Sequence, residues 1–332
     1  MLVVLGRRLR FALAATAFAL LAGPVSAGAQ ACCTATGSGE FGLVGPCHDA
    51  AVAVQLSHQQ IVASYGPTGS VAALRNATYS DTLSSVGGGI RIIDRRLELG
   101  FVTPLRLQLR RIDQDASLGF GVGDVFAGAR LTTLRDTTTG IKPGVAASYE
   151  PFLDLLAGLR FPSGRPPEAA TDPLGADAMG TGDWETSLGF KLTKFLTLTH
   201  SVALGLVWGH RYTRSLEGPA GRCRFSPGER LTLRASWTYI ANFRWSGGGF
   251  VAASFHTAAR RDGVPVEDSE SHQTTLGGFL NWAFDFPDWE LSLSLTVDPL
   301  FPGAGRNISY AGPTVALFLK RGFMASPNQA DD

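Results

Sequence analysis

Residues 96–110 read Arg-Leu-Glu-Leu-Gly-Phe-Val-Thr-Pro-Leu-Arg-Leu-Gln-Leu-Arg, and apolar and polar side chains alternate along much of this stretch. Every odd position from 97 to 109 is Leu, Phe or Thr, whereas Glu98, Arg106 and Gln108 occupy even positions. Successive side chains of a β-strand point to opposite faces, so this segment has one apolar and one charged face. Segments of about ten residues with this alternation, separated by turn residues, are typical of a transmembrane β-barrel.

Similar segments recur along most of the chain. We therefore predict an all-β protein, a transmembrane up-and-down antiparallel β-barrel of about twelve strands, within a range of roughly 10 to 14. The expected strands cover residues 50–65, 79–93, 96–110, 117–134, 148–161, 183–192, 195–209, 228–243, 248–259, 271–285, 288–299 and 308–320.

The connections between these segments alternate in length. Outer-membrane barrels have short periplasmic turns and long outer loops, so this alternation supports an up-and-down barrel. The connection at 135–147 is the exception, because it is of medium length where a short turn is expected. The short connections fall at 94–95, 193–194, 244–247 and 286–287, and the long ones at 66–78, 162–182, 210–227, 260–270 and 300–307.

The N-terminus has the three parts of a secretory signal. Arg7, Arg8 and Arg10 precede an apolar run from 11 to 22, and Ala27-Gly28-Ala29 forms a small-residue cleavage site. The apolar run is shorter than the ~20 residues that a membrane anchor needs. We expect residues 1–29 to be the signal peptide, 30–49 a periplasmic segment, 50–323 the barrel and 324–332 a C-terminal tail.

The composition and the export signal limit which partners the protein can have. The net charge of +1 gives no nucleic-acid footprint, and 17% charged residues is low against roughly 25% for soluble domains. Export combined with alternating strands predicts the outer membrane of a Gram-negative cell, with its lipid as a partner. The last expected strand has Gly312 followed by alternating apolar residues, which resembles the terminal signal read by the barrel-assembly machinery.

Four cysteines follow the expected cleavage site, and an oxidising periplasm permits disulfides. We expect Cys47 to pair with Cys32 or Cys33. A lipid-modified Cys32 is the alternative, although Ala29 stands where such signals usually carry Leu. The spacing of cysteines and histidines predicts no metal site.

The polar faces of the strands are expected to line the lumen, since a charge facing lipid costs several kcal/mol. In one interpretation these charges line a pore and determine which solutes pass. In the other they form ion pairs that fill the interior of a narrow barrel. Their nearly equal signs favour pairing. The lumen candidates are Arg91, Glu98, Arg106, Asp124, Arg130, Asp154, Arg160, Glu185, Lys191, Arg230, Arg234, Glu290 and Asp298, with the aromatic Phe120, Phe126, Phe152, Phe250 and Phe279 on the same faces.

Tryptophans are expected at the two membrane interfaces, where amphipathic rings concentrate. Trp184 and Trp208 fall at the outer ends of their strands. Trp245, Trp282 and Trp289 fall toward the periplasmic ends.

Two stretches carry a family resemblance. A Gly-x-Gly-Asp strand start, a hydrophobic-x-Phe-Pro-x-Gly strand end and a Gly-x-Gly-x-Trp strand start resemble outer-membrane transporters of the meta-pathway phenol-degradation family. This resemblance implies transport of small hydrophobic or aromatic molecules. The matching positions are Gly121, Gly123 and Asp124; Phe161, Pro162 and Gly164; and Gly180, Gly182 and Trp184.

The sequence thus predicts a channel without cofactor or catalytic residues. A structural or plugged barrel without transport is the alternative, and an outer-membrane lipid hydrolase is a third. Hydrolysis needs a Ser/His pair, but the adjacent His200 and Ser201 point to opposite faces of a strand, and the sequence contains no Gly-x-Ser-x-Gly.

Overall fold

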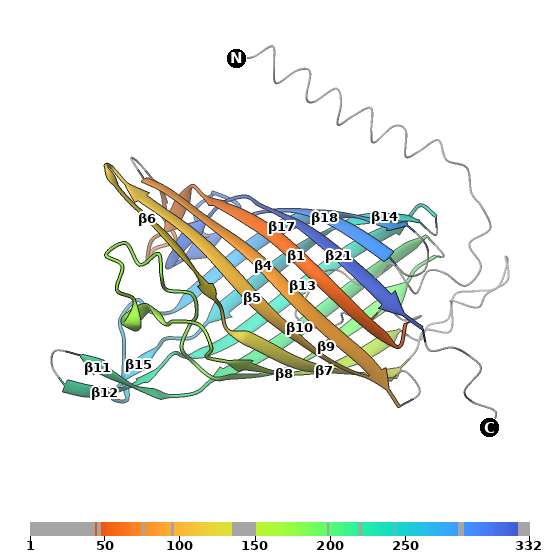
Figure 1. Cartoon of the computed structure of the whole chain (residues 1–332), viewed down its shortest axis with the longest axis horizontal. Helices are drawn as coiled ribbons and strands as arrows, with labels where there is room; N and C mark the ends of the chain where they lie inside the picture. The colour runs from red at the N-terminus through yellow and green to blue at the C-terminus, as the bar shows by residue number, and fades with distance from the viewer. Residues whose placement is uncertain are drawn as a thin grey trace, which may run out of the picture.

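The chain folds into a barrel of twelve long antiparallel strands in the computed structural model (Figure 1). The structure describes residues 44, 48–74, 77–93, 96–134, 151–197, 199–218, 221–242, 244–284 and 289–324. The barrel strands are β1 (Ala50–Ile61), β4 (Ala77–Ile92), β5 (Leu97–Ile112), β7 (Val125–Leu134), β8 (Phe152–Phe161), β9 (Glu185–Phe195), β10 (His200–Arg211), β13 (Glu229–Ile240), β14 (Trp245–His256), β17 (Ser271–Phe284), β18 (Trp289–Val297) and β21 (Thr314–Phe323).

Each barrel strand pairs with the barrel strands before and after it in the chain, and β1 pairs with β21 to close the cylinder. Ala50 lies opposite Phe323, so the first strand starts where the last one ends. Closure leaves no free sheet edge along the seam, and the backbone groups there are paired without water. The predicted up-and-down topology is confirmed.

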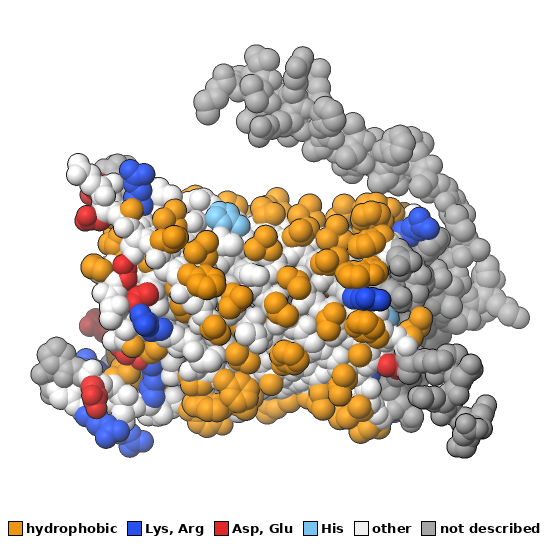
Figure 2. All heavy atoms as spheres, viewed as in Figure 1, with side chains coloured by type: hydrophobic (Ala, Val, Ile, Leu, Met, Phe, Trp, Pro, Cys, Tyr) orange, Lys and Arg blue, Asp and Glu red, His pale blue; other side chains and the backbone are white. Residues whose placement is uncertain are grey.

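The outer surface of the barrel is apolar. Figure 2 shows hydrophobic side chains spread over the length of the cylinder, with charges gathered mainly at one end. Leu293 and Leu295 on β18 are 49% and 58% exposed, while Glu290 and Ser292 on the same strand are buried. This period-two division places apolar groups on the outside and polar groups inside, as lipid requires.

A charge on the outer face should therefore be costly. Leu293 is the middle residue of β18, and we expect Leu293→Arg to lower the free energy of unfolding by about 2–4 kcal/mol. Val264→Arg is the matched control, because Val264 is also exposed but lies in β16 (Val264–Pro265), outside the barrel wall. Urea unfolding in lipid bilayers measures both. Equal losses would argue against a lipid-facing β18.

The two ends of the barrel differ. One end, the turn end, has the short connections at 196–199 and 241–244. The other end, the loop end, carries two small sheets that the sequence did not predict (Figure 1). One contains β2 (Ala63–Tyr65), β3 (Val71–Ala73) and β20 (Ile308–Ala311); the other contains β11 (Arg214–Gly218), β12 (Gly221–Ser226), β15 (Arg260–Arg261) and β16.

Several details of the strands depart from the sequence prediction. The strands expected at 50–65 and 308–320 are each divided, into β1 and β2 and into β20 and β21, and the turn expected at 244–247 lies at 241–244. The turn expected at 193–194 lies instead at 196–199, because β9 continues to Phe195. The single strand expected at 117–134 is divided into β6 (Asp115–Val122) and β7. No helix among the described residues is long and apolar enough to cross a membrane.

The break between β6 and β7 changes which face the side chains occupy. Val122 pairs with Leu105 but Phe126 pairs with Val102, so one extra residue is inserted between them. Such a bulge reverses the side-chain alternation. Phe120 is 71% exposed on the outside, whereas Phe126 is buried. The expectation that both face the lumen was wrong for Phe120.

Candidate functional site

The thirteen charged residues expected inside lie on the inner faces of their strands or directly beside the lumen. Most belong to three groups of charges: one near the turn end, one beside the closing seam and one at the loop end. Seven of these residues are buried: Glu98, Asp124, Arg130, Asp154, Glu185, Glu290 and Asp298. The others are Arg91, Arg106, Arg160, Lys191, Arg230 and Arg234.

The group near the turn end binds a piece of the N-terminal segment. Glu98 lies 3.6 Å from Arg91 and also pairs with Arg130. The backbone N–H of Val44 donates to Glu98 Oε1 at 3.0 Å. The Val44 carbonyl accepts from Arg91 and Arg130, each at 3.0 Å. Val44 is fully buried between these three side chains.

Lys320 and Glu290 form the second group, on adjacent strands beside the seam. Their Nζ and Oε2 atoms are 2.5 Å apart, and both side chains are under a tenth exposed. Asp298, directly after β18, accepts hydrogen bonds from Thr275 Oγ1 at 2.8 Å and from the Gly312 N–H at 3.2 Å.

The third group lies at the loop end around Glu185 and Asp183. Glu185 is 2.5 Å from Arg230 and 4.0 Å from Arg160. Asp183 is 2.6 Å from Arg214 and 3.4 Å from Arg211. Burial raises the pKa of Asp183, and the two arginines only partly offset that effect. These contacts connect β8, β9, β10 and β13 with β11 of the four-stranded sheet at the loop end.

The long loop at 162–182 is fixed to the barrel by Asp124. The Asp124 carboxylate accepts from the N–H of Gly164 at 3.0 Å and from the N–H and hydroxyl of Thr181 at 2.7 and 2.9 Å. A second contact joins Gln108 Nε2 to the Ala178 carbonyl at 3.0 Å. The sequence predicted Asp124 as a lumen residue; its three bonds assign it a role in holding this loop.

Glycines on β6 let the loop approach. A side chain at Gly119 would place its Cβ 1.8 Å from the Ala176 carbonyl oxygen, and one at Gly121 would meet Met179 at 2.9 Å. The opposite face of β6 carries the exposed Leu118 and Phe120. The loop thus covers the inner face of β6.

Two further aspartates stabilise the loop, Asp177 through contacts within it and Asp172 also through Ser117 on β6. Asp177 accepts from the Thr171 N–H at 2.9 Å and pairs with Arg165 at 2.6 Å, which hold its pKa well below the usual range. Asp172 accepts from Ser117 and from the N–H groups of Ala176 and Leu174, which likewise lower its pKa. Both carboxylates are therefore ionised at neutral pH.

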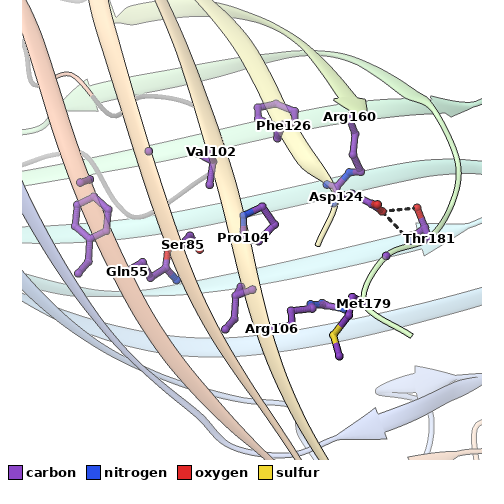
Figure 3. Close-up of a pocket in the computed structure, with 15 residues that line it drawn as sticks. Gln55, Ser85, Val102, Pro104, Arg106, Asp124, Phe126, Arg160, Met179 and Thr181 are labelled. Carbon is purple, nitrogen blue, oxygen red and sulfur yellow. Dashed lines mark hydrogen bonds between the residues drawn. The ribbon is translucent and has the colours of Figure 1, made fainter. Parts of the chain in front are cut away.

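A cavity of about 390 Å³ lies between this loop and the strands (Figure 3). Its size falls within the range of small-molecule pockets, which are mostly apolar with a few polar groups. Figure 3 shows Asp124 at its edge, joined to Thr181. Its apolar lining includes Leu83, Val102, Pro104, Phe126, Met179 and Phe318, and its charged lining residues are Arg106, Asp124 and Arg160.

A second, much smaller cavity adjoins the first, because Gln55 and Phe318 line both. Here the guanidinium of Arg234 lies 4.0 Å from the ring centroid of Phe250, with Phe279 beside them. Lys191 and Arg234 are both paired with Gly205, one on each side of it. Asp154 lies opposite Lys191 on β8 and accepts from Thr132 at 2.6 Å.

The five tryptophans expected at the interfaces lie near strand ends. At the turn end Trp245 and Trp282 stack at 5.6 Å, and Phe284 continues the row to Trp289. At the loop end Trp184 contacts Phe161 at 5.1 Å, and Trp208 lies beside His210 at 6.0 Å. The phenylalanine Phe152 packs edge-on against Phe195 at 6.1 Å.

The remaining sequence candidates are placed as follows. Cys32, Cys33 and Cys47 lie outside the described residues, and Cys223 is a free, buried thiol. His200 stacks on the outward-facing Trp237 at 5.7 Å, while Ser201 is buried on the other face. This Ser and His cannot act as a pair.

Several residues of the site were not predicted from the sequence. Phe318 and Gln55 follow the inward parity of their strands, so the alternation could have found them. Met179 and Val44 carry no such signal, because one lies in a loop and the other precedes the first strand.

Comparison with solved structures places this fold among outer-membrane barrels. It is similar to the crystal structure of the COG4313 outer membrane channel from Pseudomonas putida F1, with a TM-score of 0.66 and 17% identity over 84% of this chain and 96% of that one. The translocator domain of the autotransporter NalP from Neisseria meningitidis gives a TM-score of 0.46 and 10% identity, covering 82% of this chain and 88% of the other. Neither a protein-family model nor a curated protein matches this chain.

Proposed function

We propose that this chain is a channel in the outer membrane of a Gram-negative cell that admits small hydrophobic or aromatic molecules. The observation that carries the proposal is the cavity of about 390 Å³ inside a closed barrel, lined by Phe126, Phe318, Val102 and Pro104. A water-filled general porin would present a wider polar lumen. Here apolar walls, the loop at 162–182 and Val44 leave a narrow passage.

The orientation follows the usual plan of such barrels. Long loops face the exterior and short turns face the periplasm, so the loop end is the outer one. A cleavable signal at 1–29 delivers the chain to the periplasm, and the barrel-assembly machinery inserts it into the lipid.

A plugged barrel is the second candidate, and one observation favours it. Val44 is held by three side chains inside the lumen, which is what an occluding segment requires. The two candidates differ in whether molecules pass.

Single-channel recordings in planar bilayers separate them. We expect a small conductance step, together with faster uptake of labelled aromatic hydrocarbons by cells that carry the gene. A large ohmic step of general-porin size would contradict the narrow lumen. Silence at high voltage, from protein that still shows heat-modifiable migration, together with unchanged uptake, would favour the plug.

A further inference from the structure

The larger cavity is lined by two arginines, and one of them makes no ion pair with the described residues. Three charged residues line it. Asp124 is bound by the loop at 162–182, and Arg160 lies 4.0 Å from Glu185. For Arg106, no hydrogen bond or ion pair occurs within the part of the chain that the structure describes. A half-buried guanidinium is therefore left facing an otherwise mostly apolar space.

The carboxylate of Asp81 on the neighbouring strand forms no ion pair with Arg106. Asp81 on β4 lies opposite Gln108, two residues farther along β5, whereas Arg106 lies opposite Leu83. The cavity that Arg106 lines is otherwise formed by apolar residues such as Pro104 and Met179 and by the polar Gln55, Ser85 and Thr181, besides Asp124 and Arg160.

A ligand that satisfies this lining needs one anionic group and an apolar body. Guanidinium groups bind carboxylates through two parallel hydrogen bonds, which fixes the ligand's orientation as well as its charge. The rings of Phe126 and Phe318 offer faces to an aromatic body. We propose that the cavity binds small aromatic monocarboxylates, with Arg106 as the partner of the carboxylate.

The site for this ligand is the larger cavity alone. The second cavity adjoins it at Gln55 and Phe318 and is lined by Arg234, but at about 10 Å³ it has room for no more than about one water molecule. This inference rests on the proposed channel function and names its substrate class.

Calorimetric titration of the detergent-solubilised full chain with benzoate and with its uncharged analogue benzamide tests the assignment. We expect benzoate to bind at least about tenfold more tightly than benzamide, as a charge-assisted pair implies. Arg106→Gln should reduce benzoate affinity to that of benzamide and leave benzamide unchanged. Arg106→Lys should retain part of the preference, because it keeps the charge without the fork.

Arg111→Gln is the matched control. Arg111 is an exposed arginine on the same strand, and its replacement removes the same charge. It should change neither affinity. Heat-modifiable migration checks that each variant is folded. Equal benzoate binding by wild type and Arg106→Gln would overturn the assignment, as would wild-type protein that does not distinguish the two ligands.

Bilayer conductance, recorded in parallel, keeps the two proposals apart. If the wild-type protein conducts but its benzoate binding does not depend on Arg106, the proposed substrate class is rejected and the proposed channel function stands. Arg106-dependent binding by a protein that neither conducts nor supports uptake supports the site and rejects transport through it.

Discussion

Replacing Lys320 by Met should lower the free energy of unfolding of the barrel by about 3–5 kcal/mol. Lys320 Nζ lies 2.5 Å from Glu290 Oε2, and the two side chains are 3% and 8% exposed. Removing the ammonium leaves a buried carboxylate that, among the described residues, still accepts a hydrogen bond from Ser292 Oγ at 3.5 Å. An uncompensated buried charge costs more than the pair itself contributes.

The double variant Lys320→Met with Glu290→Leu isolates this cause. It removes both charges, so most of the lost stability should return. Arg96→Met is the control, because it also deletes one cation near the turn end but at an exposed position. Urea unfolding in lipid bilayers, followed by heat-modifiable migration, measures all three. A double variant as unstable as Lys320→Met would show that packing, and not charge, explains the loss.

This pair also shows what the alternation of side chains can and cannot predict. Glu290 was assigned to the lumen because it lies between the outward-facing Trp289 and Leu291. Lys320 falls at the predicted end of its strand, which extends to Phe323. That the two residues meet depends on the register of β18 against β21, which periodicity along one strand does not encode.

The face of a residue is predictable only while the alternation is unbroken. On the uninterrupted strand β5, Glu98 is buried and Arg106 lines the larger cavity. The alternation failed for Phe120, because the extra residue between Val122 and Phe126 inverts the faces. Gly123 and Asp124 were predicted to begin a strand, and the bulge lies at these residues. Their sequence does not specify that the register shifts there by one residue.

The loop contacts could not have been predicted, since loops have no periodicity. Asp124 was expected to line the lumen, and its position is buried beside the cavity. Its partners Gly164 and Thr181 lie 40 and 57 residues later, in the long loop. The glycines of β6 and of the loop at 162–182 are the sequence feature that fits this approach, because a residue without a side chain lets two backbones lie close together.

Replacing Asp124 by Ala should release the loop at 162–182 and raise single-channel conductance severalfold. The carboxylate accepts three hydrogen bonds from Gly164 and Thr181, and its loss leaves these donors without their acceptor. An unsatisfied buried donor costs about 1–3 kcal/mol, so the loop should leave its position and expose these groups to water. The passage beside Phe126 and Pro104 would then widen.

Cleavage by thermolysin reports loop release independently of conductance, because Met179 is buried in the closed loop. Asp115→Ala serves as control: this aspartate is exposed at the start of β6 and its removal carries the same change in charge. We expect Asp124→Ala to be cleaved within the loop and to conduct more, and Asp115→Ala to match wild type in both. Greater cleavage with unchanged conductance would mean that the loop does not limit passage, and the constriction would then have to lie deeper, where Val44 contacts Glu98, Arg91 and Arg130.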